Sequence, residues 1–194
     1  MIIGITGSIG SGKTTVAKLF SMHWYKRIDA DEIAHKLLGK NTYAYKKIIK
    51  EFGNEILNKN KNIDRGKLGD LVFNNAEKLN KLNSITHPII IKNIKKRINE
   101  IKKECPDKTR IVIDAPLLLE TKAKDLIDKI IVVKADKEVI IKRLNKKYSK
   151  EKIERILNAQ MPLDKKLEYA DFVIENNRDL IHLKKRVKEI IDKI

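Results

Sequence analysis

The sequence predicts an α/β fold of three layers, in which helices cover both faces of a five-stranded parallel sheet. Five short runs rich in β-branched residues alternate with helical patterns, which is the order typical of such a sheet. These runs are continuous rather than alternating in polarity, as expected of strands buried on both faces. The first run leads into a glycine-rich turn and then directly into a helical pattern.

The elements follow from the spacing of the apolar residues. The five predicted strands lie at 1–6, 27–30, 111–113, 130–133 and 172–174, of which the run at 27–30 is the weakest. Helical spacing predicts helices over 44–52, 68–73, 79–85, 89–101, 137–144, 150–159 and 180–194. Pro88 fits the first turn of the helix over 89–101. The apolar stripe of the last helix is expected to face the core.

The 194 residues suit one domain with inserts. No strand pattern occurs over 37–87, so this stretch is predicted to be a helical insert between the second and third strands. A second, short and charged insert is predicted over 145–165. The core then consists of the remaining ranges, which are 1–36, 88–144 and 166–194.

Lysine plus arginine number 43 and aspartate plus glutamate 26, which gives a formal net charge of +17. The excess is made of 35 Lys and only 8 Arg, and Ile is nearly as frequent as Lys, at 31. A bias toward Ile and Lys along the whole chain is therefore the simplest explanation. Anionic small substrates and nucleic acid are the alternatives, although no aromatic platform or recognition helix favours nucleic acid.

The composition also bears on location. No apolar run approaches the roughly 20 residues needed to span a bilayer, and Met1 leads into an apolar stretch without a basic segment, so no signal peptide is expected. Cys105 is the only cysteine, so an intrachain disulfide is excluded, which fits a reducing compartment. We therefore expect a cytoplasmic protein without a membrane partner. The oligomeric state is left open.

The glycine-rich turn, Gly7–Thr14, fits the pattern G-x-x-x-x-G-K-[ST] between a predicted strand and a predicted helix. In this pattern, glycines let backbone N–H groups surround an anion at the positive end of the helix. We expect phosphate contacts from Gly10, Ser11, Gly12 and Lys13. The Thr14 hydroxyl is a candidate ligand for Mg²⁺, and Thr15 is either a second phosphate contact or an ordinary helix residue.

Carboxylates follow two of the predicted strands. Asp29 and Asp31 come after the second strand and Asp114 ends the third, where the carboxyl ends of parallel strands form a ligand crevice. Such carboxylates can deprotonate an acceptor hydroxyl or help to hold Mg²⁺. Helix capping explains Asp29 and Asp31 equally well, and a capped strand end explains Asp114.

A set of motifs in a fixed order makes the chain similar to the dephospho-coenzyme A kinases over nearly its whole length. The set comprises Gly7–Thr14, Asp29-Ala30-Asp31, Asp64-Arg65, His87-Pro88, Pro116-Leu117-Leu118 with Glu120, Arg143, and Arg155-Ile156 with Gln160. The resemblance implies a P-loop kinase core, a helical CoA domain and a lid. It also implies transfer of a phosphoryl group from ATP, with Mg²⁺, to the ribose 3′-hydroxyl of dephospho-CoA.

The resemblance further implies roles for single residues. Asp31 would be the base facing the 3′-hydroxyl, assisted by Lys13 and Arg143. Residues expected to bind the acceptor are Asp29, Asp31, Arg65, His87, Pro116, Leu117 and Arg155. Arg143 would also bind the nucleotide. The residues alone allow plainer roles for two of these, since His87 could cap the next helix and Arg155 could be a solvated surface residue.

Three departures from the family pattern stand out. Trp24 lies in the segment before the second strand, where the family usually has Gly, and we expect it to pack rather than to stack on adenine. Lys146 and Lys147 stand near the place of a second lid arginine. The turn after the last strand reads Asn176-Asn177-Arg178, and Asn tolerates the left-handed backbone expected there.

Three functions compete. The first is the dephospho-CoA kinase reaction. The second is a P-loop kinase that acts on another nucleoside, nucleotide or small-molecule hydroxyl, which the helical insert would decide. The third is a nucleic-acid-binding P-loop protein, which would bind with a steep salt dependence. A GTPase is disfavoured because Asn145–Tyr148 lacks the Asp of the base-reading motif N-K-x-D.

Overall fold

The computed structural model describes residues 1–106 and 109–194 of the chain. These residues form two compact units. The first unit comprises Met1–Asp29 and Ile98–Ile194, and the second comprises Ala30–Arg97. The insert expected over 37–87 falls within the second unit, and its limits and those of the lid over 145–165 stay predictions.

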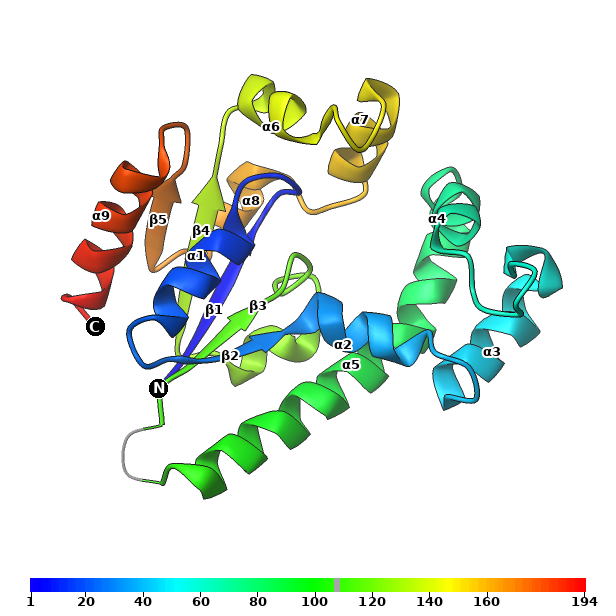
Figure 1. Ribbon diagram of the computed structural model, residues 1–194, viewed down its shortest axis with the longest axis horizontal. Helices are drawn as coiled ribbons and strands as arrows, with labels where there is room; N and C mark the ends of the chain where they lie inside the picture. The colour runs from blue at the N-terminus through cyan, green and yellow to red at the C-terminus, as the bar shows by residue number, and fades with distance from the viewer. Residues whose placement is uncertain (107–108) are drawn as a thin grey trace. The chain divides into compact units, whose positions relative to one another are not determined.

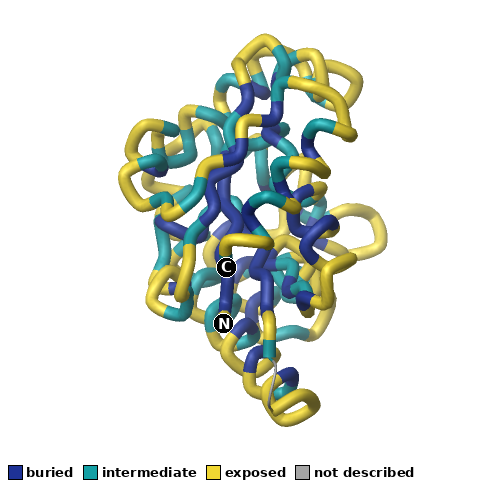
Figure 2. The backbone as a smooth tube through the Cα atoms, turned by 90° about the vertical axis from the view of Figure 1, so that its left-hand side faces the viewer, coloured by how far each residue is buried: buried dark blue, intermediate teal, exposed yellow. Residues whose placement is uncertain are grey.

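The first unit is built on a five-stranded parallel sheet, which confirms the predicted fold class. Its strands are β1 (Ile2–Gly7), β2 (Lys26–Asp29), β3 (Ile111–Asp114), β4 (Lys129–Lys134) and β5 (Phe172–Glu175). Their order is β2-β3-β1-β4-β5 (Figure 1). β1 and β3 are buried along their whole length, whereas the edge strands are partly exposed (Figure 2). β1 therefore lies at the centre, with its carboxyl end flanked by β3 and β4.

Two helices form the core against the sheet. α1 (Lys13–Ser21) and α9 (Leu180–Ile191) contact each other and bury apolar residues against β1, β3, β4 and β5. The expected stripe of α9 is confirmed, since Leu183, Val187 and Ile190 are all buried. α6 (Lys137–Leu144) and α7 (Lys150–Asn158) lie at the end of the sheet to which β4 points (Figure 1). The unit also contains the 3₁₀ helix η2 (Lys122–Leu126) and the short helix α8 (Leu163–Leu167).

The second unit consists of helices. They are α2 (Ala30–Leu37), α3 (Tyr43–Phe52), the 3₁₀ helix η1 (Asn54–Ile56), α4 (Arg65–Phe73) and the first part of α5 (Ala76–Glu104). Side-chain caps begin two of them: the Thr42 hydroxyl accepts from Tyr45 N, and the Asp64 carboxylate accepts from Gly66 N and Lys67 N. Buried residues of α3 and α4, such as Ile48 and Leu68, form a separate apolar cluster.

The prediction of two helices around Pro88 is wrong, because α5 runs through it without a break. A proline inside a helix lacks the N–H for the usual bond and costs about 3 kcal/mol. Apolar residues on both sides of Pro88 nevertheless keep helical spacing, and Leu82, Ile85 and Ile89 pack against the same cluster. Their shared burial outweighs the local cost. His87 is consequently an interior helix residue and not a cap.

The expectation that Trp24 packs is also wrong, since its side chain is 91% exposed. Trp24 follows the end of α1 with φ 67°, in the left-handed region. Tyr25 N donates to Phe20 O at 3.4 Å, and the Phe20 and Tyr25 rings meet edge to face with centroids 5.1 Å apart. These contacts form a Schellman ending, in which the left-handed position usually holds Gly. The chain keeps the backbone shape of a glycine turn with a tryptophan in it.

We predict that Trp24→Gly raises the free energy of unfolding by about 1 kcal/mol, because it relieves the left-handed strain and removes almost no buried surface. Urea denaturation followed by circular dichroism measures the change. Met22→Gly is the matched control, since Met22 is 72% exposed but right-handed, with φ −70°. That control should lower stability, and a Trp24→Gly variant no more stable than the parent would contradict the prediction.

Candidate active site

The loop between β1 and α1 has the shape of an anion cradle. Gly10 and Gly12 are left-handed, with φ 76° and 96°. A Cβ on Gly12 would lie 2.2 Å from Asn176 Nδ2, and one on Gly10 would lie 2.9 Å from Leu144 Cδ1, so a side chain at either position would displace its neighbour and strain the left-handed backbone. The loop leads directly into α1, whose first N–H groups lack helical partners. The loop and helix end therefore fit a phosphate chain.

Lys13 and Thr14 are the first two residues of α1 and are half-buried, whereas Thr15 is exposed. Ser11, within the loop, is fully buried. No three His, Cys, Asp or Glu residues of the described chain cluster in a way that could hold a metal. Mg²⁺ commonly binds through substrate phosphates with one or two protein oxygens. The Thr14 hydroxyl beside a phosphate cradle fits that kind of donor set.

Arg143, in the last turn of α6, braces the loop through its carbonyl oxygens. Its Nη1 donates to Gly10 O at 3.2 Å and to Ser11 O at 3.4 Å, and its Nη2 donates to Asn176 O at 2.9 Å. The structure thus brings Arg143 and the phosphate loop together. Its contacts are with the peptide oxygens of the loop, and its role toward phosphate stays a prediction.

Asn176 is a site residue that the sequence did not reveal. The left-handed turn expected at Asn176 and Asn177 is wrong, because neither residue has a positive φ. Asn176 instead continues from β5, with its N–H bonded to Lys134 O, and is 6% exposed. Its Nδ2 donates to Ser11 O at 2.7 Å. The only local signal in the sequence was the position of Asn176 directly after the last predicted strand.

The carboxylates at the ends of β2 and β3 form one charged group. Asp29 and Asp114 are register partners, and Arg27 Nη2 donates to the Oδ2 atom of each, at 2.9 Å for Asp114. Asp114 is 2% exposed, and its Oδ1 has no hydrogen-bond partner among the described residues. Arg27 also went unnoticed in the sequence. It partly compensates the two negative charges at this edge of the sheet.

The loop after β3 is tied to the end of β1. Pro116 O accepts from Thr6 Oγ1 at 3.2 Å and from Lys166 Nζ at 2.8 Å. Leu117 is half-buried, while Leu118 is fully buried. The loop is therefore fixed beside the phosphate loop, and the structure brings Pro116 and Leu117 to the carboxyl edge of the sheet.

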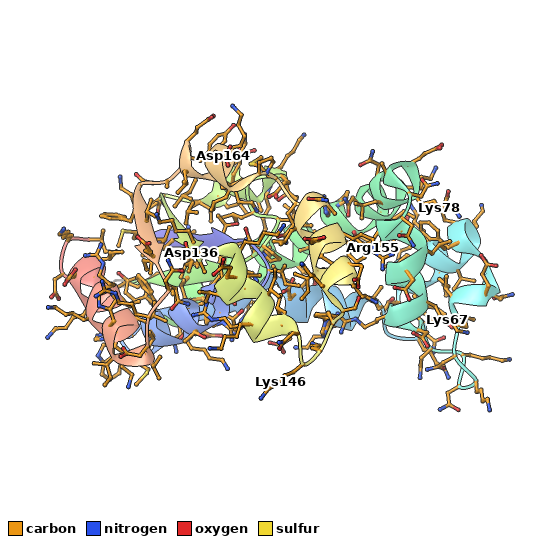
Figure 3. The ribbon with its side chains drawn as sticks, turned by 90° about the horizontal axis from the view of Figure 1, so that it is seen from above. Lys67, Lys78, Asp136, Lys146, Arg155 and Asp164 are labelled. Atoms are coloured by element: carbon orange, nitrogen blue, oxygen red, sulfur yellow. The ribbon has the colours of Figure 1, made fainter. Side chains whose placement is uncertain are left out.

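The segment predicted to be a lid carries α7 and meets the phosphate loop at its far end. Ile9 N donates to Gln160 Oε1 at 3.1 Å. Arg155 lies on α7, and Lys146 is exposed and points away from the ribbon (Figure 3). Lys147 Nζ lies over the Tyr148 ring, 5.3 Å from its centroid. Of the lid cations that the sequence singled out, Lys146 extends into solvent and Lys147 stacks on its neighbour.

Known proteins resemble this chain over its whole length. A model of the dephospho-CoA kinase family matches residues 1–182. The chain belongs to this family. A dephospho-CoA kinase from Carboxydothermus hydrogenoformans is 42% identical over 99% of this chain and 93% of its own length. The solved dephospho-CoA kinase from Campylobacter jejuni is 32% identical, with a TM-score of 0.69 over 99% of this chain and 96% of that one.

A shikimate kinase structure from Acinetobacter baumannii shares the fold alone, with 14% identity and a TM-score of 0.54 over 99% of this chain and 91% of that one. Membership in a dephospho-CoA kinase family makes the chain a kinase, with ATP as the phosphoryl donor. Within the two described ranges, no helix is long and apolar enough to cross a membrane.

The remaining residues to which the family resemblance gave roles lie in the second unit. Asp31 is exposed in the first turn of α2. Arg65 is the first residue of α4, and its Nη1 lies 3.4 Å from His35 Nδ1. His87 lies within α5. Inside this unit the structure therefore joins Arg65 to His35, a residue of α2 that the sequence had not singled out.

We predict that Asn176→Ala weakens ATP binding about tenfold. The substitution removes the shorter of the two hydrogen bonds to Ser11 O and leaves the longer one from Arg143. The lost hydrogen bond costs about 0.5–1.5 kcal/mol, which loosens the cradle. Isothermal titration calorimetry with ATP measures the affinity. Asn176→Asp keeps the size but brings a carboxylate to the cradle, so it should bind ATP more weakly still. Unchanged affinity in both variants would show that the Asn176 amide does not shape the loop.

Proposed function

We propose that this chain transfers the γ-phosphoryl group of ATP to the 3′-hydroxyl of the dephospho-CoA ribose, giving CoA and ADP. The observation that carries this proposal is the cradle of Gly10 and Gly12, braced by Arg143, in a chain whose relatives are named dephospho-CoA kinases. In the reaction, the bond between O3′ and Pγ forms and the bond between Pγ and the bridging oxygen of ADP breaks.

The cradle would hold the donor. Backbone N–H groups of the loop would bind the β- and γ-phosphates, and Lys13 would place a point charge against them. The transition state of phosphoryl transfer is largely dissociative, so positioning and cation placement contribute most of the rate. Arg143 and the lid residue Arg155 would supply planar guanidinium groups for equatorial phosphate oxygens.

Mg²⁺, when bound by Thr14 and the phosphates, would neutralise charge that develops on the β- and γ-oxygens. Thr14 is suited to this role because it lies in the first turn of α1, next to the cradle that would hold the phosphates. Thr15, which is exposed, is the less suitable of the two threonines for such a contact.

Asp31 would accept the proton that the 3′-hydroxyl loses as O3′ attacks Pγ. Asp29, paired with Arg27, would keep the chain between β2 and α2 in place. The family resemblance implies the residues that would bind the rest of the acceptor. They are Asp29, Arg65, His87, Pro116, Leu117 and Arg155.

An acceptor panel tests the proposed function. ADP release from ATP is followed with dephospho-CoA, a nucleoside, a nucleoside monophosphate or shikimate as the acceptor. Turnover that depends on dephospho-CoA supports the proposal. Turnover with another acceptor alone would make the chain a kinase of that substrate, and ATP hydrolysis without any acceptor dependence would remove the proposal.

We predict that Asp31→Asn lowers kcat about 10²- to 10⁴-fold, because the amide cannot accept the proton. ATP affinity should stay within about threefold of the parent, since Asp31 is not part of the phosphate cradle. Steady-state kinetics and calorimetry measure the two effects. Glu32→Gln is the matched control, because Glu32 is an exposed neighbour paired with Lys36, and it should keep full activity. A loss of ATP affinity at unchanged kcat would refute the role of Asp31.

A further inference from the structure

Among the described residues of this lysine-rich chain, Lys166 stands out because it is completely buried. Lys166 lies in α8 with a side-chain exposure of 0%, whereas its neighbour Lys165 is 64% exposed and pairs with Glu168. The Lys166 ammonium donates to Pro116 O at 2.8 Å and forms an ion pair with Glu120 Oε1 at 2.9 Å. A buried ammonium is stable only with such partners, so its position is specified by the fold.

The partners of Lys166 connect it to two other segments. Pro116 O also accepts from Thr6 Oγ1, at the end of β1, and Glu120 Oε1 also accepts from Met161 N, in the link between α7 and α8. Lys166 therefore lies where the strand that enters the phosphate loop, the loop after β3 and the end of the lid segment meet. Each of these segments carries a residue to which the proposed reaction assigns a role.

The same link is attached to the phosphate loop one residue earlier. Gln160 Oε1 accepts from Ile9 N at 3.1 Å, next to the Met161 N–H that Glu120 holds. The end of the lid segment is thus fixed at two successive residues, one on the phosphate loop and one on the Glu120–Lys166 pair. Lys166 compensates the charge of Glu120. Among the described residues, Glu120 forms no other ion pair.

We propose that Lys166 is a positioning residue for phosphoryl transfer. Its ammonium fixes Pro116 in the acceptor loop and, through Glu120, the base of the lid, so that α7 and its Arg155 keep one geometry relative to the phosphate loop. This inference rests on the proposed function. It assigns no contact between Lys166 and a substrate, because its donors are directed at Pro116 O and Glu120.

Lys166→Met tests the inference against the matched control Lys165→Met. We expect Lys166→Met to lower kcat at least tenfold per folded molecule while the affinity for ATP stays within about threefold, because the cradle itself is untouched. Cleavage after Lys146 and Lys147, which neither variant alters, by a limiting amount of trypsin should become faster. Lys165→Met should match the parent in kcat, ATP affinity and cleavage rate.

A purely structural role would reduce the amount of folded protein without changing kcat per folded molecule, and that outcome overturns the proposal. Circular dichroism gives the folded fraction for this normalisation. If Lys166→Met does not fold, the neutral pair Glu120→Gln with Lys166→Met replaces it, since no buried charge is then left alone. A kcat of the neutral pair within twofold of the parent overturns the proposal. If the parent enzyme itself shows no turnover that depends on dephospho-CoA, the proposed function is refuted instead.

Discussion

The site depends on one constraint, which is that a loop presenting its N–H groups to an anion must satisfy its carbonyl oxygens elsewhere. Here the oxygens of Gly10 and Ser11 are bonded by Arg143 and Asn176, from α6 and from the end of β5. The amide of Asn176 that donates to Ser11 O also lies against Gly12, where a Cβ would crowd it. The same contact therefore explains both the hydrogen bond and the glycine. The shape of the cradle therefore depends on Arg143 and Asn176, which lie outside the glycine-rich motif, as much as on the motif itself.

The order of the strands explains how these donors reach the loop. β1 is central, and its neighbours β3 and β4 lead to the Pro116 loop and to α6, while β5 adds Asn176 from the next position in the sheet. In a parallel sheet all of these connections leave from the carboxyl edge. Segments that are more than a hundred residues apart, such as Thr6 and Pro116, consequently become hydrogen-bonded neighbours.

The sequence predicted the elements whose signal is local. Five strands, the phosphate loop and the core-facing stripe of α9 were all visible in residue spacing. Pro88 and Trp24 misled because a local preference was outweighed by packing in α5 and by the Schellman ending of α1. Lys166 could not be found in a chain with 35 lysines, because its burial follows from where α8 meets Glu120 and not from its own neighbours.

The cations at the carboxyl edge of the sheet are of two kinds, those paired with a carboxylate and those that are not. Arg27 is paired with Asp29 and Asp114, and Lys166 is paired with Glu120, so their charges are largely balanced within the protein. Arg143 bonds only to peptide oxygens, and among the described residues neither Arg143 nor Lys13 forms an ion pair.

A guanidinium held by carbonyl oxygens is fixed in place while it keeps its full charge for a ligand. The net charge of +17 therefore says little about the site, since most of the lysines that the structure describes are exposed and the buried Lys166 is paired with Glu120. Lys13 and Arg143, which form no ion pair among the described residues, stand beside a loop whose shape favours an anion, and we expect these two cations to select phosphate.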